Sequence, residues 1–123
     1  MKMRVVFVSG PFRAANGWEI EQNIRRAEEV ALELWRMGAA VICPHTNTRF
    51  YQGAAPDDVW LKGDLAILER CDAIVLIDGW SASEGAQAEM EHAIFREIEM
   101  FDWGVPGDRA ALKEWIDAGS VPA

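Results

Sequence analysis

Short apolar runs, separated by segments with helical periodicity, constrain the fold of this chain more than any other feature. Three runs are continuous enough to be buried strands: Val5–Val8, Ala39–Cys43 and Ala73–Ile77. A fourth, shorter strand is predicted at Glu99–Trp103. Strands without a polar face are typical of parallel sheets that are covered by helices on both sides.

The segments between these runs carry the helical pattern. From Glu19 to Met37 apolar residues recur at three- and four-residue steps, and Gly38 follows as a C-cap. Further helices are predicted from Asp57 or Asp58, as N-cap, to Arg70, and from about Ser83 to Glu97. A last helix is predicted from a cap at Asp108 to about Ala118.

Strand and helix therefore alternate four times along the chain. This order predicts an α/β fold with a small parallel sheet of four to five strands and right-handed crossovers. A long loop is expected at His45–Pro56. The chain has 123 residues, enough for one domain with a real core, so we expect a single domain over residues 1–123.

Composition excludes several classes of function. The formal net charge of -8 argues against a nucleic-acid polymer or an anionic membrane as partner, but it permits a small nucleotide. The two cysteines, Cys43 and Cys71, have no CxxC spacing, so neither a disulfide nor a zinc site is expected, and a cytoplasmic location fits. The apolar run after Met1 is too short for a signal peptide or a membrane span.

One stretch, Asp78–Glu89, joins the third strand directly to the third helix. Ligands of open α/β sheets bind at the carboxyl ends of the strands, so this junction is a candidate site. Ser81 and Glu84 have capping-box spacing, which predicts helix initiation there. Ser83 is an equally good candidate for the cap.

Glu89 is the most informative polar residue of this helix. The helical phase gives an inward stripe of Ala86, Met90, Ala93 and Ile94, with Glu89 on its border. A carboxylate at that place, beside a ligand edge, is a candidate for chemistry. The alternative is a boundary residue that reaches solvent or pairs with Arg96.

Two loops are expected at the same edge. In Gly10–Arg13 the glycine permits close backbone approach and Arg13 could hold an anion, although Arg13 could equally be a surface charge. Neither a Walker motif nor GxGxxG is present. In Pro44–Arg49, His45, Thr46 and Asn47 suit a sugar or a base, whereas a structural histidine and an ordinary turn are the alternatives.

Two further residues are candidates only in this context. Asp64 would be a solvated charge on its own, but paired carboxylates can divide the roles of nucleophile and proton donor. Trp80 could stack on a base or a sugar, and simple packing is the alternative.

Five segments, taken in this order, resemble the nucleoside 2-deoxyribosyltransferase-like family, above all its short bacterial and phage members. They are Val6–Arg13, Asn23–Glu28, Cys43–Asn47, Cys71–Trp80 and Ser83–Glu89. The likeness spans roughly residues 5 to 98. It implies a flavodoxin-like three-layer sandwich and cleavage of an N-glycosidic bond.

The resemblance also implies roles. The family's helix glutamate, which attacks C1′ and forms a glycosyl ester, matches Glu89; an aspartate on the preceding helix matches Asp64 more loosely. A serine six residues before the glutamate in the nucleotide-hydrolysing branch matches Ser83, and the first loop contacts the sugar or its 5′-phosphate. The expected substrate-binding residues are Ser9, Gly10, Pro11, Phe12, Arg13, His45, Asn47, Trp80, Ser83 and Gly85.

The sequence thus predicts an enzyme that cleaves or transfers at the N-glycosidic bond of a (deoxy)nucleoside or nucleoside 5′-monophosphate, with no metal or cofactor. Transferase and hydrolase remain open. A non-catalytic nucleotide-binding or sensing domain is the main alternative. A phosphoribohydrolase is a third, although the Pro-Gly-Gly lead-in of that class is missing. We expect a homo-oligomer, most simply a two-fold dimer.

Overall fold

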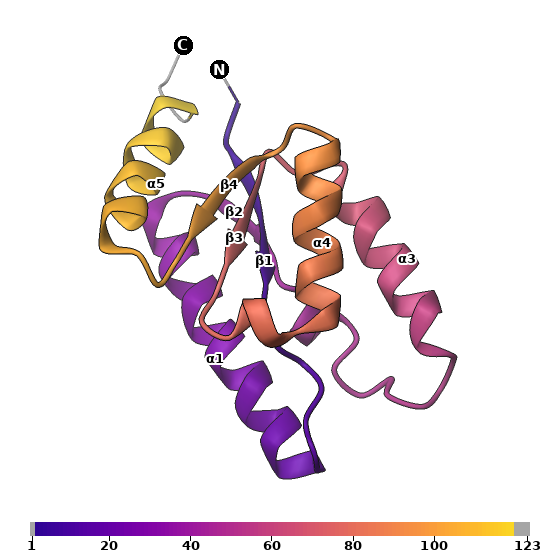
Figure 1. Ribbon diagram of the computed structural model, residues 1–123. Coiled ribbons are helices and arrows are strands. Elements are labelled where there is room, and N and C mark those ends of the chain that lie inside the picture. Colours follow the sequence, from indigo (N-terminus) through magenta and orange to yellow (C-terminus); the bar gives the residue numbers. More distant parts are fainter. Residues whose placement is uncertain (1, 120–123) are drawn as a thin grey trace.

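The computed structural model describes residues 2–119, which form an α/β fold of flavodoxin-like architecture in three layers (Figure 1). The middle layer is a four-stranded, all-parallel sheet in the order β2-β1-β3-β4. This confirms the predicted parallel sheet. The strands are β1 (Val5–Ser9), β2 (Ala40–Ile42), β3 (Ala73–Leu76) and β4 (Glu99–Asp102).

Helices cover both faces of the sheet (Figure 1). One face packs against α1 (Gly17–Met37) and α5 (Pro106–Gly119), the other against α3 (Asp57–Leu68) and α4 (Glu84–Phe95). Each strand serves both cores because successive side chains point to opposite faces. In β1, Val6 and Val8 join the core under α1 and α5, whereas Phe7 joins the core under α3 and α4.

The register of the strands brings the ends of β1 and β3 together. Ser9 lies opposite Leu76, and the backbone N–H of Ile77 donates to the Ser9 carbonyl at 2.9 Å. The chain then leaves β1 through Gly10 and leaves β3 through Asp78. A Cβ on Gly10 would overlap the Ile77 side chain, so glycine is needed for this close approach.

Several predicted helix starts are wrong. α1 begins at Gly17, where the Asn16 side chain caps the backbone N–H of Glu19. α3 has Pro56 at its N-cap and no side-chain cap; Asp57 and Asp58 lie in its first turn, where they complement the helix dipole. α5 begins at Pro106, and Asp108 instead accepts from the backbone N–H of Asp102 at 2.9 Å.

Two short helical segments were not predicted. α2 (Pro44–Asn47) opens the expected loop, because Pro44 at the first position fixes φ for a helical turn. A 3₁₀ turn, η1 (Trp80–Ala82), lies between β3 and α4. Within the described residues, no helix has the length and apolarity that a membrane span requires.

The C-cap of α1 gives a test of the fold. Gly38 has φ 103° and its N–H bonds to the carbonyls of Leu34 and Trp35. Gly38→Ala should lower the free energy of unfolding by about 1 kcal/mol or more, because an L side chain is strained at positive φ. Urea unfolding measures this change.

Gly63, in the middle of α3, is the matched control for Gly38. A Cβ there meets nothing within 4 Å, so Gly63→Ala should raise stability by roughly 0.5–1 kcal/mol. An equal loss of stability in Gly38→Ala and Gly63→Ala would contradict the role of Gly38 as the C-cap of α1.

Candidate functional site

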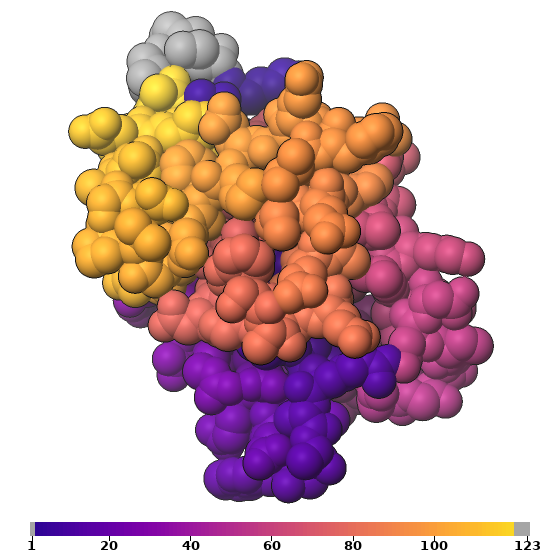
Figure 2. All heavy atoms as spheres, viewed as in Figure 1, coloured from indigo at the N-terminus to yellow at the C-terminus, as the bar shows by residue number. Residues whose placement is uncertain are grey.

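A cavity of about 860 Å³ opens at the carboxyl edge of the sheet. Its walls are the loop after β1, the α2 region, one face of α3 and the first turns of α4. Figure 2 shows the start of α4 in orange above the loop and first half of α1 in indigo and purple. The cavity brings together these predicted site residues: Gly10, Pro11, Phe12, Arg13, His45, Asp64, Ser83, Gly85 and Glu89.

Glu89 lies deep in this cavity, with only 7% of its surface exposed. Its Oε1 accepts a hydrogen bond from Ser9 Oγ at 2.6 Å, so the end of β1 holds the carboxyl group. Within the described residues, Oε2 has no hydrogen-bond partner from a side chain or the backbone. Ser9 itself lies beneath the lining and is fully buried.

The inward face of α4 differs from the expected stripe. Ala86, Glu89 and Ala93 are the buried positions, whereas Ile94 is 57% exposed. Glu89 therefore belongs to the inward face and not to its border. The pairing of Glu89 with Arg96 is wrong, because the Arg96 guanidinium binds Glu69 at 2.9 Å.

Burial changes the acidity of both cavity carboxyl groups. Loss of solvation raises the pKa of Glu89 to about 8; the Ser9 hydrogen bond lowers it and the charge of Asp64 raises it further. Burial raises the pKa of Asp64 to about 6. At neutral pH, Glu89 is therefore mostly protonated in the free protein.

Ser83 begins α4 at the rim of the cavity. Its Oγ accepts from the backbone N–H of Ala86 at 3.2 Å, so Ser83 is the N-cap. The capping-box prediction for Ser81 and Glu84 is wrong, because η1 takes Ser81 out of the position before the helix. Gly79, with φ 90°, packs against Pro11, and a Cβ there would come within 2.9 Å of the Pro11 ring.

Neighbouring elements hold the loop after β1 through its carbonyl groups. His45 Nε2 lies 2.8 Å from the Pro11 carbonyl, and Asn23 Nδ2 donates to the Phe12 carbonyl at 3.1 Å. Because the carbonyl can only accept, Nε2 of His45 carries a proton. Burial lowers the pKa of His45, so the ring is neutral at pH 7. Asn23, which is buried at 7% exposure, was not predicted from the sequence to have a role.

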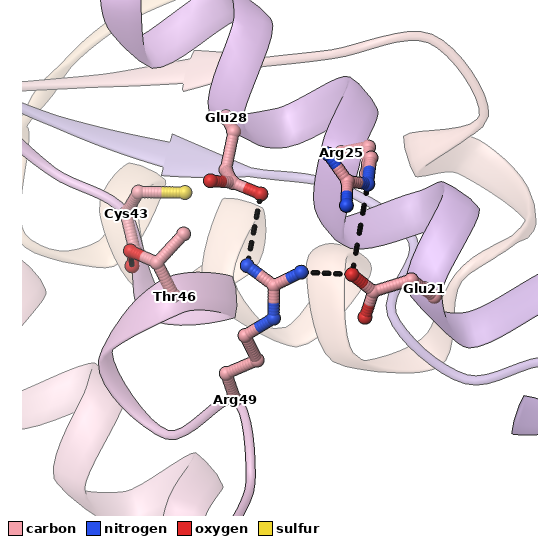
Figure 3. A network of polar contacts seen from close by, with 6 residues as sticks. All are labelled: Glu21, Arg25, Glu28, Cys43, Thr46 and Arg49. Atoms are coloured by element: carbon pink, nitrogen blue, oxygen red, sulfur yellow. Dashed lines mark hydrogen bonds and ion pairs between the residues drawn. The ribbon is translucent and has the colours of Figure 1, made fainter.

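An ion-pair network fixes the α2 wall against α1 (Figure 3). Arg49 binds both Glu21 and Glu28 of α1, the latter at 3.1 Å. Arg25 approaches Glu21 at 3.7 Å, and Thr46 Oγ1 donates to the Cys43 carbonyl at 3.0 Å. This network joins the segment that carries His45 to α1.

Besides Ser9, which lies beneath the lining, three predicted binding residues lie differently from expectation. Asn47 is exposed and outside the lining, because it ends the short helix α2. Trp80 packs against the core under α3 and α4, and its Nε1 donates to Asp102 at 3.3 Å, so packing accounts for it. Arg13 lines the cavity, but it forms an ion pair with Asp57.

Other lining residues were not singled out from the sequence. On α3, Asp57, Trp60 and Leu61 share one face with the predicted Asp64 at helical spacing, and this spacing is a signal that the sequence contains. The remaining ones have no clear sequence signal: Pro44, Thr48, Gln52, Asp58, Gly79, Ala82, Glu84 and Ala86. Across residues 2–119, no three His, Cys, Asp or Glu side chains are grouped so as to hold a metal ion.

The sequence of this chain matches a known protein family. Residues 4–101 match the family model described as a domain of unknown function (DUF4406). The chain belongs to this family. No curated protein has a significant match to the sequence.

A solved structure shares the fold of this DUF4406 chain. It is a 2-deoxyribosyltransferase from the psychrotolerant bacterium Bacillus psychrosaccharolyticus, described as a biocatalyst for nucleoside synthesis. The two chains are 19% identical, with a TM-score of 0.56 over 80% of this chain and 72% of the other. At that identity the likeness establishes a common fold.

The raised pKa of Glu89 predicts how stability depends on pH. Between pH 4.5 and about 8 the native protein binds more protons at this group than the unfolded chain, so its contribution to stability falls as pH rises. Glu89→Gln removes this cost. The free energy of unfolding that this variant gains over the natural protein should be larger at pH 8 than at pH 5, by on the order of 1–3 kcal/mol.

Urea unfolding at the two pH values measures the effect. Glu91→Gln, on the exposed side of α4, is the matched control and should show no such pH dependence. A Glu89→Gln gain that is equal at both pH values would contradict a strongly raised pKa.

Proposed function

We propose that this protein cleaves or transfers at the N-glycosidic bond of a (deoxy)nucleoside or nucleoside 5′-monophosphate, through a glycosyl ester on Glu89. One observation supports it above all: Glu89, which is only 7% exposed and is held by Ser9 at 2.6 Å, lines a cavity large enough for a nucleoside. The shared fold with a 2-deoxyribosyltransferase agrees with this proposal.

The proposed reaction begins with Glu89 as the carboxylate. As the base leaves, positive charge develops at the anomeric carbon, and an adjacent carboxylate stabilises this charge and captures C1′. Ser9 fixes the orientation of the attacking group by its hydrogen bond to Oε1. A second base or water then resolves the ester, giving transfer or hydrolysis respectively.

Asp64 is proposed as the proton donor to the departing base. It lines the same cavity, and its pKa of about 6 keeps a fraction of it protonated near neutral pH. The loop Gly10–Arg13, His45, Ser83 and Gly85 are proposed to bind the sugar and the base. Asn47 and Trp80, which lie outside the lining, have no part in this proposal.

A non-catalytic nucleotide-binding or sensing role is the second candidate. The observation that favours it is the protonation of Glu89 at neutral pH in the free protein, because a protonated carboxyl group is a poor nucleophile. The two candidates differ in whether free base appears.

Incubation with a panel of nucleosides and 5′-monophosphates, with chromatography for free base, tests the proposal. Glu89→Gln and Glu89→Ala should abolish base release while the protein stays folded by circular dichroism. Asp64→Asn should cost less, about 10²–10⁴-fold, and a better leaving base should partly restore its rate. Glu91→Gln is the control and should keep full activity.

Two results would reject the covalent role. One is near-normal base release by Glu89→Ala. The other is equal loss in the Glu89 and Asp64 variants, with equal rescue by a good leaving base. Nucleotide binding without any base release would instead support the sensing role.

The pH profile separates the two possible roles of Asp64. If Asp64 donates a proton, activity needs ionised Glu89 with protonated Asp64, so kcat/KM should be bell-shaped with limbs near pH 6 and 8. Because the pKa of Glu89 lies two units above that of Asp64, on the order of 1% of the free enzyme has Glu89 ionised and Asp64 protonated. If Asp64 acts only as a carboxylate, kcat/KM should rise through pH 8 and stay high.

A two-fold homo-oligomer remains part of the proposal. Large side chains such as Trp18, Phe50 and Phe95 are 74%, 86% and 78% exposed, which is apolar surface that association would cover.

A further inference from the structure

The cavity lining is strongly acidic. It carries the five carboxyl groups of Asp57, Asp58, Asp64, Glu84 and Glu89. Arg13 is the one Lys or Arg side chain in the described lining, and Asp57 already pairs with it. Asp58 pairs with Lys62, which lies outside the lining. Among the described residues, Asp64, Glu84 and Glu89 have no ion-pair partner.

Neither His45 nor the N-terminus of α4 offsets the negative charge of the cavity lining. His45 is neutral at pH 7 because burial lowers its pKa. The first turn of α4 offers backbone N–H groups, but Ser83 Oγ occupies the Ala86 N–H, and the carboxylate of Glu84 sits in the same turn. A phosphate in the cavity would therefore meet unpaired carboxylates without a free cation.

A buried nitrogen of His45 gives an independent indication of the ligand. His45 lines the cavity and is only 5% exposed, yet its Nδ1 is buried without a hydrogen-bond partner in the described part of the chain. Buried polar atoms are normally paired, and Nδ1 is an acceptor because Nε2 carries the proton, so this nitrogen indicates a ligand that offers positive charge or a donor. The buried Nε1 of Trp60 in the same lining also has no partner there, and it would donate to an acceptor of the ligand. A metal ion does not fit, because no group of three ligating side chains occurs within residues 2–119.

We propose that the substrate of this cavity is a nucleoside without a phosphate whose base carries a positive charge, such as a pyridinium or an N-alkylated purine. This inference rests on the proposed function. Of the two substrate classes in the proposed function, it selects the nucleoside over the 5′-monophosphate. It also requires that the base carries a positive charge.

The chemistry of such a substrate suits the site. When the N-glycosidic bond breaks, its electron pair stays on the ring nitrogen and neutralises the base, so the base leaves without taking up a proton. For such a substrate Asp64 acts only as a carboxylate and not as the proton donor. A carboxylate oxygen of Glu89 forms the new bond to C1′. Water then hydrolyses the ester, which returns the carboxylate and releases the sugar with one proton.

A cationic base would also prepare Glu89 for attack. A positive charge in the cavity lowers the pKa of nearby carboxyl groups, the reverse of the effect that Asp64 has on Glu89. Binding would thus release the Glu89 proton and produce the reactive carboxylate. A neutral nucleoside leaves Glu89 protonated, and a phosphate would raise its pKa further.

The test compares three probes: nicotinamide riboside, inosine and nicotinamide mononucleotide, in ribo and 2′-deoxyribo forms. They carry, respectively, a cationic base, an uncharged base, and the same cationic base with a 5′-phosphate. Base release should favour nicotinamide riboside in kcat/KM by at least about tenfold over each of the others, as expected for one opposite charge at short range. The Glu89→Gln protein supplies the blank for spontaneous hydrolysis.

Wall variants identify the source of the preference. Glu84→Gln combined with Asp58→Asn should reduce the preference for the cation severalfold, because these carboxylates line the cavity without a proposed catalytic role. Glu91→Gln, which removes a charge from α4 outside the lining, is the matched control. Higher ionic strength should weaken the preference in the same direction.

Binding separates this inference from the proposed function. Titration calorimetry of the same probes on Glu89→Gln reports charge preference without catalysis. Tighter binding of nicotinamide riboside, with no base release by the natural protein, would support the charge preference and reject the enzyme. Equal or better binding and turnover of the mononucleotide or inosine would overturn the inference and leave the enzyme intact. Binding of none of the probes would overturn both.

Discussion

The contact between Glu89 and Ser9 is the interaction on which the rest of the site depends. Ser9 ends β1, and Glu89 lies one and a half turns into α4, so the hydrogen bond joins two segments that are 80 residues apart. Parallel strands make this possible, because the ends of β1 and β3 meet at one edge and α4 leaves from that edge. A carboxyl group inside a helix–sheet contact is costly to bury, and the serine hydroxyl offsets only part of that cost.

Two walls of the cavity, the loop after β1 and the α2 region, are held in place by α1. This helix has no residue in the lining. Asn23 bonds to the Phe12 carbonyl, and Arg49 joins the α2 region to Glu21 and Glu28. These bonds fix backbone that would otherwise be free loop. A site assembled from several loops keeps its geometry only if such supporting contacts restrict them, so α1 supports the cavity although it contributes no lining residue.

The apolar runs predicted the sheet, because strands buried on both sides leave an unmistakable pattern. They also located Glu89, but helical phase alone placed it on the border of a stripe, since α4 packs with Ala86 and Ala93 inward and Ile94 outward. Position along the chain was not enough to predict where the Trp80 ring lies. Trp80 follows β3, yet η1 turns its ring into the core. Trp60 was missed because its meaning depends on which face of α3 meets the cavity, and this depends on tertiary packing.

The acidic lining has two effects that share one cause. The charge of Asp64 helps to keep the proton on Glu89, and the same field makes the cavity unfavourable for anions. In the empty cavity Glu89 is therefore mostly protonated at neutral pH. Only a ligand that supplies positive charge reverses both effects at once, since it is attracted by the lining and lowers the pKa of Glu89. Under the proposed function, recognition and activation are then a single electrostatic event, and the burial of Glu89 makes its reactivity depend on the ligand.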